Sequence, residues 1–95
     1  MEKLREIKFY QSYFLEYYKA QSEKVQKKID FILQVLETQH FISEKYVKHI
    51  TNSNGIYEIR ISIGSNEYRI LFFFESGDLI SGGKIIVLGN GFLKK

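Results

Sequence analysis

The stretch that most constrains the fold is residues 55–75, GIYEIRISIGSNEYRILFFFE, which contains two alternating segments around a turn. Apolar residues recur at every second position, from Tyr57 to Ile63 and again from Tyr68 to Phe74. A period of two is typical of a strand that buries one of its faces. The sequence therefore predicts a β-hairpin whose two strands present one apolar row to a core.

The turn determines which residues of the two strands face each other. Gly64 and Ser65 suit a two-residue type II′ loop, which has glycine at its first central position. In that register Arg60 lies directly opposite Arg69. A shift by one residue would place the apolar row against the polar row, so the register with the two arginines paired is favoured.

This arginine pair is the most informative detail of the hairpin. Like charges directly opposite each other destabilise a sheet, and local rules of this kind tend to be broken at functional sites. Two planar guanidinium groups side by side can bind a phosphate or a carboxylate. Alternatively, Glu58 and Glu67 lie diagonally nearby and neutralise the pair on a solvated face. We expect the pair on the face away from the helices, and we expect Arg69→Ala to fold because it removes a repulsion.

The rest of the chain predicts an α+β fold in a single domain over residues 1–95, with a short strand near residues 4–9. Aromatic residues then recur at spacings of three and four between Tyr10 and Tyr18, which indicates a helix. Ser22 is a suitable N-cap for a second amphipathic helix that ends near Thr38. We expect both helices to pack on one face of a small antiparallel sheet.

The segments around the hairpin are less regular. Ser43 is expected to cap a single turn before the hairpin, and residues 79–80 are expected to form a brief extended piece. The apolar run KIIVL at residues 84–88 predicts a central strand that is buried on both faces. The final residues Lys94 and Lys95 are expected to be unanchored.

Composition excludes several classes of protein. The chain has no cysteine, so disulfides and thiolate chemistry are excluded, and His40 and His49 stand without a carboxylate cluster at metal-ligand spacing. We expect no metal and no cofactor. There is neither a membrane-length apolar run nor a signal peptide, which favours the cytoplasm. The net charge of +3 lies wholly in residues 45–95, where seven Lys and Arg face four Asp and Glu, and this favours a polyanionic partner.

The groups left for chemistry are cationic or protonatable, and they suit RNA cleavage without a metal ion. In that reaction the 2′-hydroxyl attacks the adjacent phosphorus, a base takes its proton, and cations stabilise the developing negative charge. The candidate residues are Lys48, His49, Arg60, Arg69, Lys94 and Lys95.

Three motifs carry a resemblance to a known family. GIYEIR at residues 55–60, YRI at residues 68–70 and GFLKK at residues 91–95 follow a pair of helices in the order typical of that family. The chain resembles the RelE/HigB-type toxins, in particular the phage-derived Gp49-like branch of the RelE/ParE superfamily. The resemblance implies two helices on an antiparallel sheet, with the family's C-terminal helix absent from this sequence.

The resemblance also implies a function: a ribosome-dependent mRNA endoribonuclease that a cognate antitoxin holds inactive and that needs no metal or membrane. It assigns phosphate binding to Arg60 and Arg69, and further charge or proton transfer to Lys48, Lys94 and Lys95. Lys45, His49 and Phe92 are the candidate RNA contacts. Two alternatives remain open, namely a ParE-like gyrase inhibitor on the same fold and a weakened or truncated domain that still binds an antitoxin.

Overall fold

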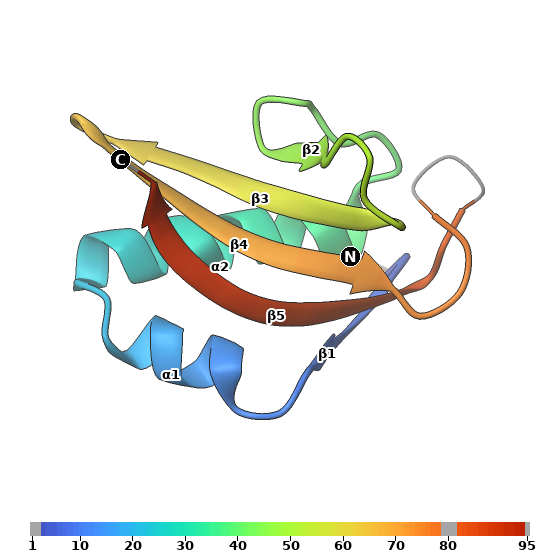
Figure 1. Cartoon of the computed structure of the whole chain (residues 1–95), viewed down its shortest axis with the longest axis horizontal. Coiled ribbons are helices and arrows are strands. Elements are labelled where there is room, and N and C mark those ends of the chain that lie inside the picture. Colours follow the sequence, from blue (N-terminus) through green and yellow to red (C-terminus); the bar gives the residue numbers. More distant parts are fainter. Residues whose placement is uncertain (1–2, 79–81, 95) are drawn as a thin grey trace.

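The computed structural model describes residues 3–78 and 82–94 and contains two helices and one five-stranded sheet (Figure 1). Along the chain the elements are β1 (Glu6–Phe9), α1 (Tyr13–Lys19), α2 (Glu23–Thr38), β2 (Val47–His49), β3 (Ile56–Ile63), β4 (Asn66–Phe74) and β5 (Ile85–Lys94). The strand order is β1-β5-β4-β3-β2. The predicted α+β fold, with two helices on one face of the sheet, is confirmed.

The predicted hairpin is present with the predicted register. Gly64 has a φ of +60°, as the first central position of a type II′ loop requires, and Ile63 pairs with Asn66. Arg60 is the Cα partner of Arg69. The alternation of the sequence and the chemistry of the turn therefore act together to fix this pairing.

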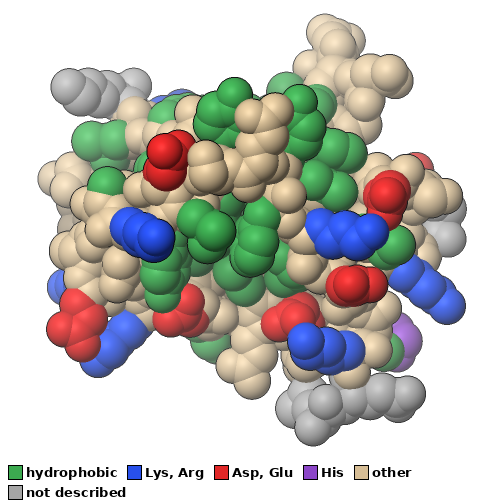
Figure 2. Space-filling view, turned by 90° about the horizontal axis from the view of Figure 1, so that it is seen from below, with side chains coloured by type: hydrophobic (Ala, Val, Ile, Leu, Met, Phe, Trp, Pro, Cys, Tyr) green, Lys and Arg blue, Asp and Glu red, His purple; other side chains and the backbone are tan. Residues whose placement is uncertain are grey.

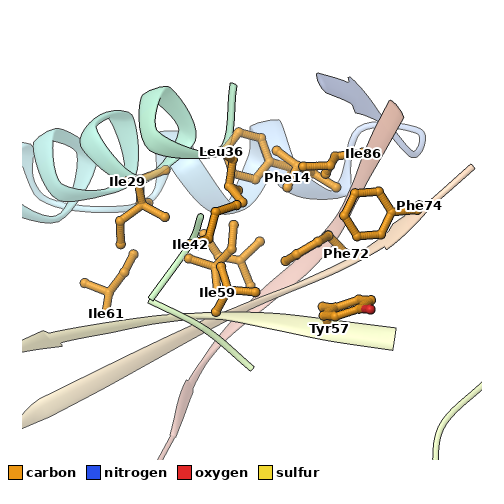
Figure 3. Close-up of a cluster of buried hydrophobic side chains, with 14 of the residues drawn as sticks. Phe14, Ile29, Leu36, Ile42, Tyr57, Ile59, Ile61, Phe72, Phe74 and Ile86 are labelled. Atoms are coloured by element: carbon orange, nitrogen blue, oxygen red, sulfur yellow. The ribbon is translucent and has the colours of Figure 1, made fainter. Parts of the chain in front are cut away.

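The core lies between α2 and the hairpin (Figure 3). Ile29 and Leu36 of α2 point toward the sheet, and the apolar rows of β3, β4 and β5 complete the cluster. Its fully buried members on the sheet are Ile59, Ile61, Ile70, Phe72, Ile86 and Leu88. Each of these side chains contributes about 1.5–3 kcal/mol by leaving water, so this layer holds the sheet and α2 together.

Both ends of α2 are capped by side chains. The Ser22 hydroxyl accepts a hydrogen bond from the Val25 amide at 3.4 Å, which confirms the predicted N-cap. At the other end the buried Arg5 donates to the carbonyl oxygens of Leu36 at 2.8 Å and Gln39 at 2.7 Å. A cation at a helix C-terminus complements the helix dipole, so Arg5 ties the N-terminal segment to the end of α2.

Helix α1 rests on β5 at a glycine. A Cβ atom on Gly91 would lie 2.5 Å from the ring of Tyr17, so only glycine allows this approach. Beside this contact, the segment from Phe9 to Leu15 leaves several aromatic and aliphatic side chains 40–49% exposed: Phe9, Tyr10, Tyr13 and Leu15. Figure 2 views the molecule from the side where α1 and β1 lie, and hydrophobic side chains form a continuous area there.

The structure differs from the sequence-based expectations in the sheet. β1 pairs with β5 in parallel, so the sheet is mixed, and only β2 to β5 form the expected antiparallel part. The central strand is β4, and β5 is buried on one face only, with Ile85 and Val87 half-buried. The predicted turn at Ser43 is present, but it leads into the short strand β2, which the sequence did not predict. The extended piece expected at residues 79–80 lies outside the described residues.

Candidate functional site

The arginine pair lies on the face of the sheet away from the helices, which we call the open face. Ile59 and Ile70 are Cα partners and pack in the core beneath α2. Because successive side chains of a strand point to opposite faces, their neighbours Arg60 and Arg69 point to the open face. Both are held by strand backbones in the middle of the ladder, and the predicted placement of the pair is confirmed.

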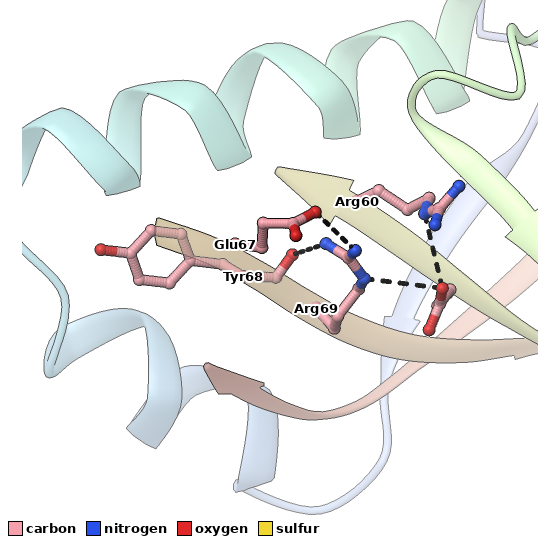
Figure 4. Close-up of polar contacts among 5 residues, drawn as sticks. Arg60, Glu67, Tyr68 and Arg69 are labelled. Carbon is pink, nitrogen blue, oxygen red and sulfur yellow. Dashed lines mark hydrogen bonds and ion pairs between the residues drawn. The ribbon is translucent and has the colours of Figure 1, made fainter. Parts of the chain in front are cut away.

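Arg69 is almost completely buried, with only 2% of its side chain exposed. Its Nη2 donates to Glu67 Oε1 at 2.8 Å, and its Nη1 donates to the carbonyl oxygen of Tyr68 at 3.2 Å (Figure 4). Its Nε has no hydrogen-bond partner, although Glu58 Oε1 lies 3.5 Å away as an ion pair. The guanidinium group is therefore fixed by one carboxylate and approached more loosely by a second.

Glu58 is shared between the two arginines. The same oxygen, Oε1, lies 3.5 Å from the Nε of Arg60 and 3.5 Å from the Nε of Arg69. The side chain of Arg60 is 31% exposed and that of Glu58 is 16% exposed. In the protein alone, the carboxylates therefore offset the repulsion between the arginines, which is the second of the two interpretations that the sequence left open.

The strands on either side add two lysines to the open face. Lys48 of β2 is the Cα partner of Glu58, and Lys94 of β5 is the partner of Glu67. Directly opposite residues of an antiparallel pair point to the same side of the sheet. The open face thus gathers four cations (Lys48, Arg60, Arg69 and Lys94) and two carboxylates (Glu58 and Glu67), so four minus two gives a local charge of +2.

The hydrogen bond from Arg69, followed by its positive charge, lowers the pKa of Glu67 below its ordinary value. Lys94 and Arg60 lower the pKa of Glu67 further by their charges. The carboxylate of Glu67 is therefore ionised at neutral pH. The effect of Lys94 shows that its charge reaches this cluster from β5.

Phe92 completes the row of the two arginines. It is the Cα partner of Arg69 on β5, and its ring is 42% exposed. An exposed aromatic ring beside a phosphate-binding group can stack on a nucleobase.

The expectation that Lys94 is unanchored is wrong, because the ladder between β4 and β5 continues to Lys94.

Two of the candidate RNA contacts lie apart from this cluster. His49 follows Lys48 on β2 and turns to the other face, where its ring meets that of Tyr57 edge-on with 5.0 Å between centroids. Lys45 Nζ lies 5.8 Å from the ring centroid of Tyr46, whose ring contacts Phe31 of α2. Lys95 lies outside the described residues and stays a prediction.

The sequence indicates Glu58 and Glu67 as neutralising groups, but it does not indicate that one oxygen of Glu58 serves both arginines. The alternation of β3 does indicate that Glu58 is near Arg60, because the two residues are two positions apart and share a face.

In residues 3–78 and 82–94, no three His, Cys, Asp or Glu side chains gather as ligands for a metal ion. Within the same part of the chain, no helix is long and apolar enough to cross a membrane.

One comparison with known families matches most of the chain. The phage-derived protein Gp49-like family (DUF891) matches residues 16–95, which include α2, every strand from β2 to β5 and the whole cationic cluster. The chain belongs to this family. The Gp49-like family is related to the RelE-type toxins, which sets the protein in a toxin–antitoxin context and implies an antitoxin partner. No curated protein and no solved structure matches the sequence.

Proposed function

We propose that this Gp49-like protein is the toxin of a type II toxin–antitoxin system and cleaves mRNA on the ribosome, in the cytoplasm and without a metal ion. The observation that carries the proposal is the pairing of Arg60 with Arg69 on the open face, between Lys48 on β2 and Lys94 on β5. The relation of the family to RelE-type toxins supports the toxin class and the antitoxin partner.

The arginine pair would bind the scissile phosphate of the RNA. A guanidinium group donates two parallel hydrogen bonds to a phosphate, and two such groups on neighbouring strands can hold its oxygens from two sides. Arg60 has the more exposed side chain of the two and offers the first contact. Phe92, across the ladder from Arg69, is the platform on which an adjacent base would stack.

Cleavage then needs charge stabilisation and two proton transfers. The 2′-oxygen forms a bond to phosphorus, the bond from phosphorus to the 5′-oxygen breaks, and the arginines stabilise the extra negative charge between these events. We assign the proton transfers to Lys48 and Lys94, which flank the pair. One of them, in its neutral form, accepts the 2′-hydroxyl proton, and the other donates a proton to the leaving oxygen. Lys95 remains a sequence-based candidate for the same role.

A second candidate function is supported by the burial of Arg69. A guanidinium group that is 2% exposed and already paired with Glu67 is poorly accessible to a phosphate. This favours a domain that still binds an antitoxin but cleaves weakly or not at all. The two candidates agree on the partner and differ only in the chemistry of the open face.

The test is translation in a cell-free extract, followed by mapping of the mRNA ends. We expect the protein to arrest translation and to create new ends, and Arg60→Ala to slow cleavage about 10²–10³-fold because it removes one donor to the transition state. Lys27→Ala, on the exposed side of α2, is the matched control and should cleave like the unaltered protein. No new ends together with antitoxin binding would favour the second candidate, and inhibition of DNA gyrase without RNA cleavage would favour the ParE-like alternative.

A further inference from the structure

The two carboxylates of the open face contact the arginines in different ways. Glu67 forms a hydrogen bond of 2.8 Å with Arg69 Nη2, at the outer end of the guanidinium group. Glu58 stands between the two arginines, where one oxygen lies 3.5 Å from each Nε, beyond the usual length of a charge-assisted hydrogen bond. Glu67 therefore anchors Arg69, whereas Glu58 occupies the space between Arg69 and Arg60.

That space has unused hydrogen-bonding capacity. The Nε of Arg69 is buried and donates to no acceptor, and a buried donor without a partner costs free energy. A tetrahedral phosphate presents more acceptor oxygens than a single carboxylate oxygen and can reach both Nε donors. The carboxylate of Glu58 therefore supplies a negative charge between the arginines but leaves their hydrogen-bonding capacity only partly used.

We infer that Glu58 is an internal occupant of the anion site formed by Arg60 and Arg69, and that a phosphate group binds there by displacing it. The inference deepens the proposed function, because it concerns the arginine pair to which that function assigns the scissile phosphate. It also explains how a phosphate reaches Arg69, since the shared carboxylate lies over its Nε.

The displacement needs only a side-chain rotation. The backbone of Glu58 is held on both sides, by Lys48 on β2 and by Leu71 on β4, so the strand stays in place. The carboxylate is partly exposed, and Lys48 is its cross-strand partner. After displacement, Glu58 turns toward the ammonium group of Lys48, and the negative charge keeps a cation beside it.

An internal competitor lowers the apparent affinity for the external ligand by the fraction of molecules in which the site is free. Removing the charge of Glu58 should therefore tighten phosphate binding. We expect Glu58→Gln to bind about tenfold more tightly, as for a site that is free in about one molecule in ten. A residue that simply supported the site would give the opposite sign.

The experiment titrates inorganic phosphate, and then a 2′-deoxy oligonucleotide that cannot undergo attack by a 2′-hydroxyl, into ¹⁵N-labelled protein. The arginine Nε–H resonances report directly on Arg60 and Arg69, and the amide spectrum confirms that each variant is folded. Glu75→Gln is the matched control, because it removes one negative charge from an exposed ion pair with Lys8. Unchanged or weaker phosphate binding by Glu58→Gln, or equal tightening by Glu75→Gln, would overturn the inference.

A second variant keeps the charge but shortens the side chain. Glu58→Asp withdraws the carboxylate from the two guanidinium groups by one methylene, and its phosphate affinity should lie between those of the unaltered protein and Glu58→Gln. Phosphate binding does not depend on RNA cleavage, so the two proposals fail separately. Tighter binding by Glu58→Gln in a protein that cleaves no mRNA would leave the inference standing without the nuclease function, and the reverse result would leave the nuclease function standing alone.

Discussion

On the helix-covered face of the hairpin, Ile59 lies opposite Ile70, and both are fully buried. On the open face Arg60 lies opposite Arg69, whose side chain is 2% exposed. The isoleucines are packed among apolar neighbours, and the hydrophobic effect that stabilises them does not depend on the direction of individual contacts. The guanidinium group of Arg69 is instead paired with Glu58 and Glu67, which act through particular atoms. One face of the hairpin therefore supplies stability, and the other holds a charge arrangement that a single substitution can change.

The largest effect should come from the helix-covered face. Phe72→Ala removes a fully buried ring from the core and should lower the free energy of unfolding by about 3–5 kcal/mol. Phe73 is the matched control, because it is the next residue of β4 and points to the open face with 37% exposure. Phe73→Ala should cost about 1 kcal/mol or less in urea unfolding. Equal losses for the two variants would remove the distinction between the faces.

An intermediate effect is expected from Arg69. The sequence alone suggested that Arg69→Ala would relieve a repulsion, but Glu58 and Glu67 already offset that repulsion. The substitution instead leaves two carboxylates close together without their buried cation. We expect a loss of about 1–3 kcal/mol, below the range for a fully buried pair because Glu67 is half exposed.

Arg60→Ala is the control for this experiment, since it removes the opposite member of the same pair. Its side chain is 31% exposed and contacts Glu58 alone among the ion pairs of the described residues, so urea unfolding should show a loss below about 1 kcal/mol. If Arg69→Ala proved as stable as the unaltered protein, Arg69 would be an ordinary surface residue despite its burial.

The smallest effect concerns acid. The pKa of Glu67 is lowered in the folded protein, so its contribution to stability is present at neutral pH and is lost as the pH falls from the ordinary value of 4.5 through the lowered one. Glu67→Gln lacks this contribution and should lose less stability between pH 5 and pH 2.5, as measured by urea unfolding at each pH. In the Arg69→Ala background this difference should shrink to the smaller part that Lys94 and Arg60 contribute. An undiminished difference there would show that Arg69 is not the main partner of Glu67.

The sequence predicted those parts of the fold that depend on residues close together in the chain. The register of the hairpin depends on Gly64 and on alternation over adjacent residues, and it was predicted correctly. The parallel pairing of β1 with β5 depends on chain direction across the sheet, which periodicity does not encode. β2 has only three residues, too few to show alternation, so the separation of Lys48 from His49 onto two faces was missed.

The candidate site shows the same limit. Alternation placed Arg60 and Arg69 together, and it indicated that Glu58 and Glu67 are near them. The sharing of one oxygen of Glu58 depends on side-chain conformation, which the sequence does not contain. Lys94 was expected to be unanchored because it is one of the final residues of the sequence, whereas β5 continues past an irregularity in its pairing and carries Lys94 into the ladder.

The parallel ladder between β1 and β5 has a consequence for the synthesis of the protein. Glu6 pairs with Ile85, so 85 minus 6 gives 79 residues that must be added after Glu6 before its partner exists. At 5–20 residues per second this delay is roughly 4–16 s. Phe92 and Lys94 lie on β5, the last strand to be synthesised. While β5 is still inside the ribosomal exit tunnel, the open face of the nascent protein is therefore incomplete. On the proposed function, the ribosome that makes the toxin is spared until β5 has emerged.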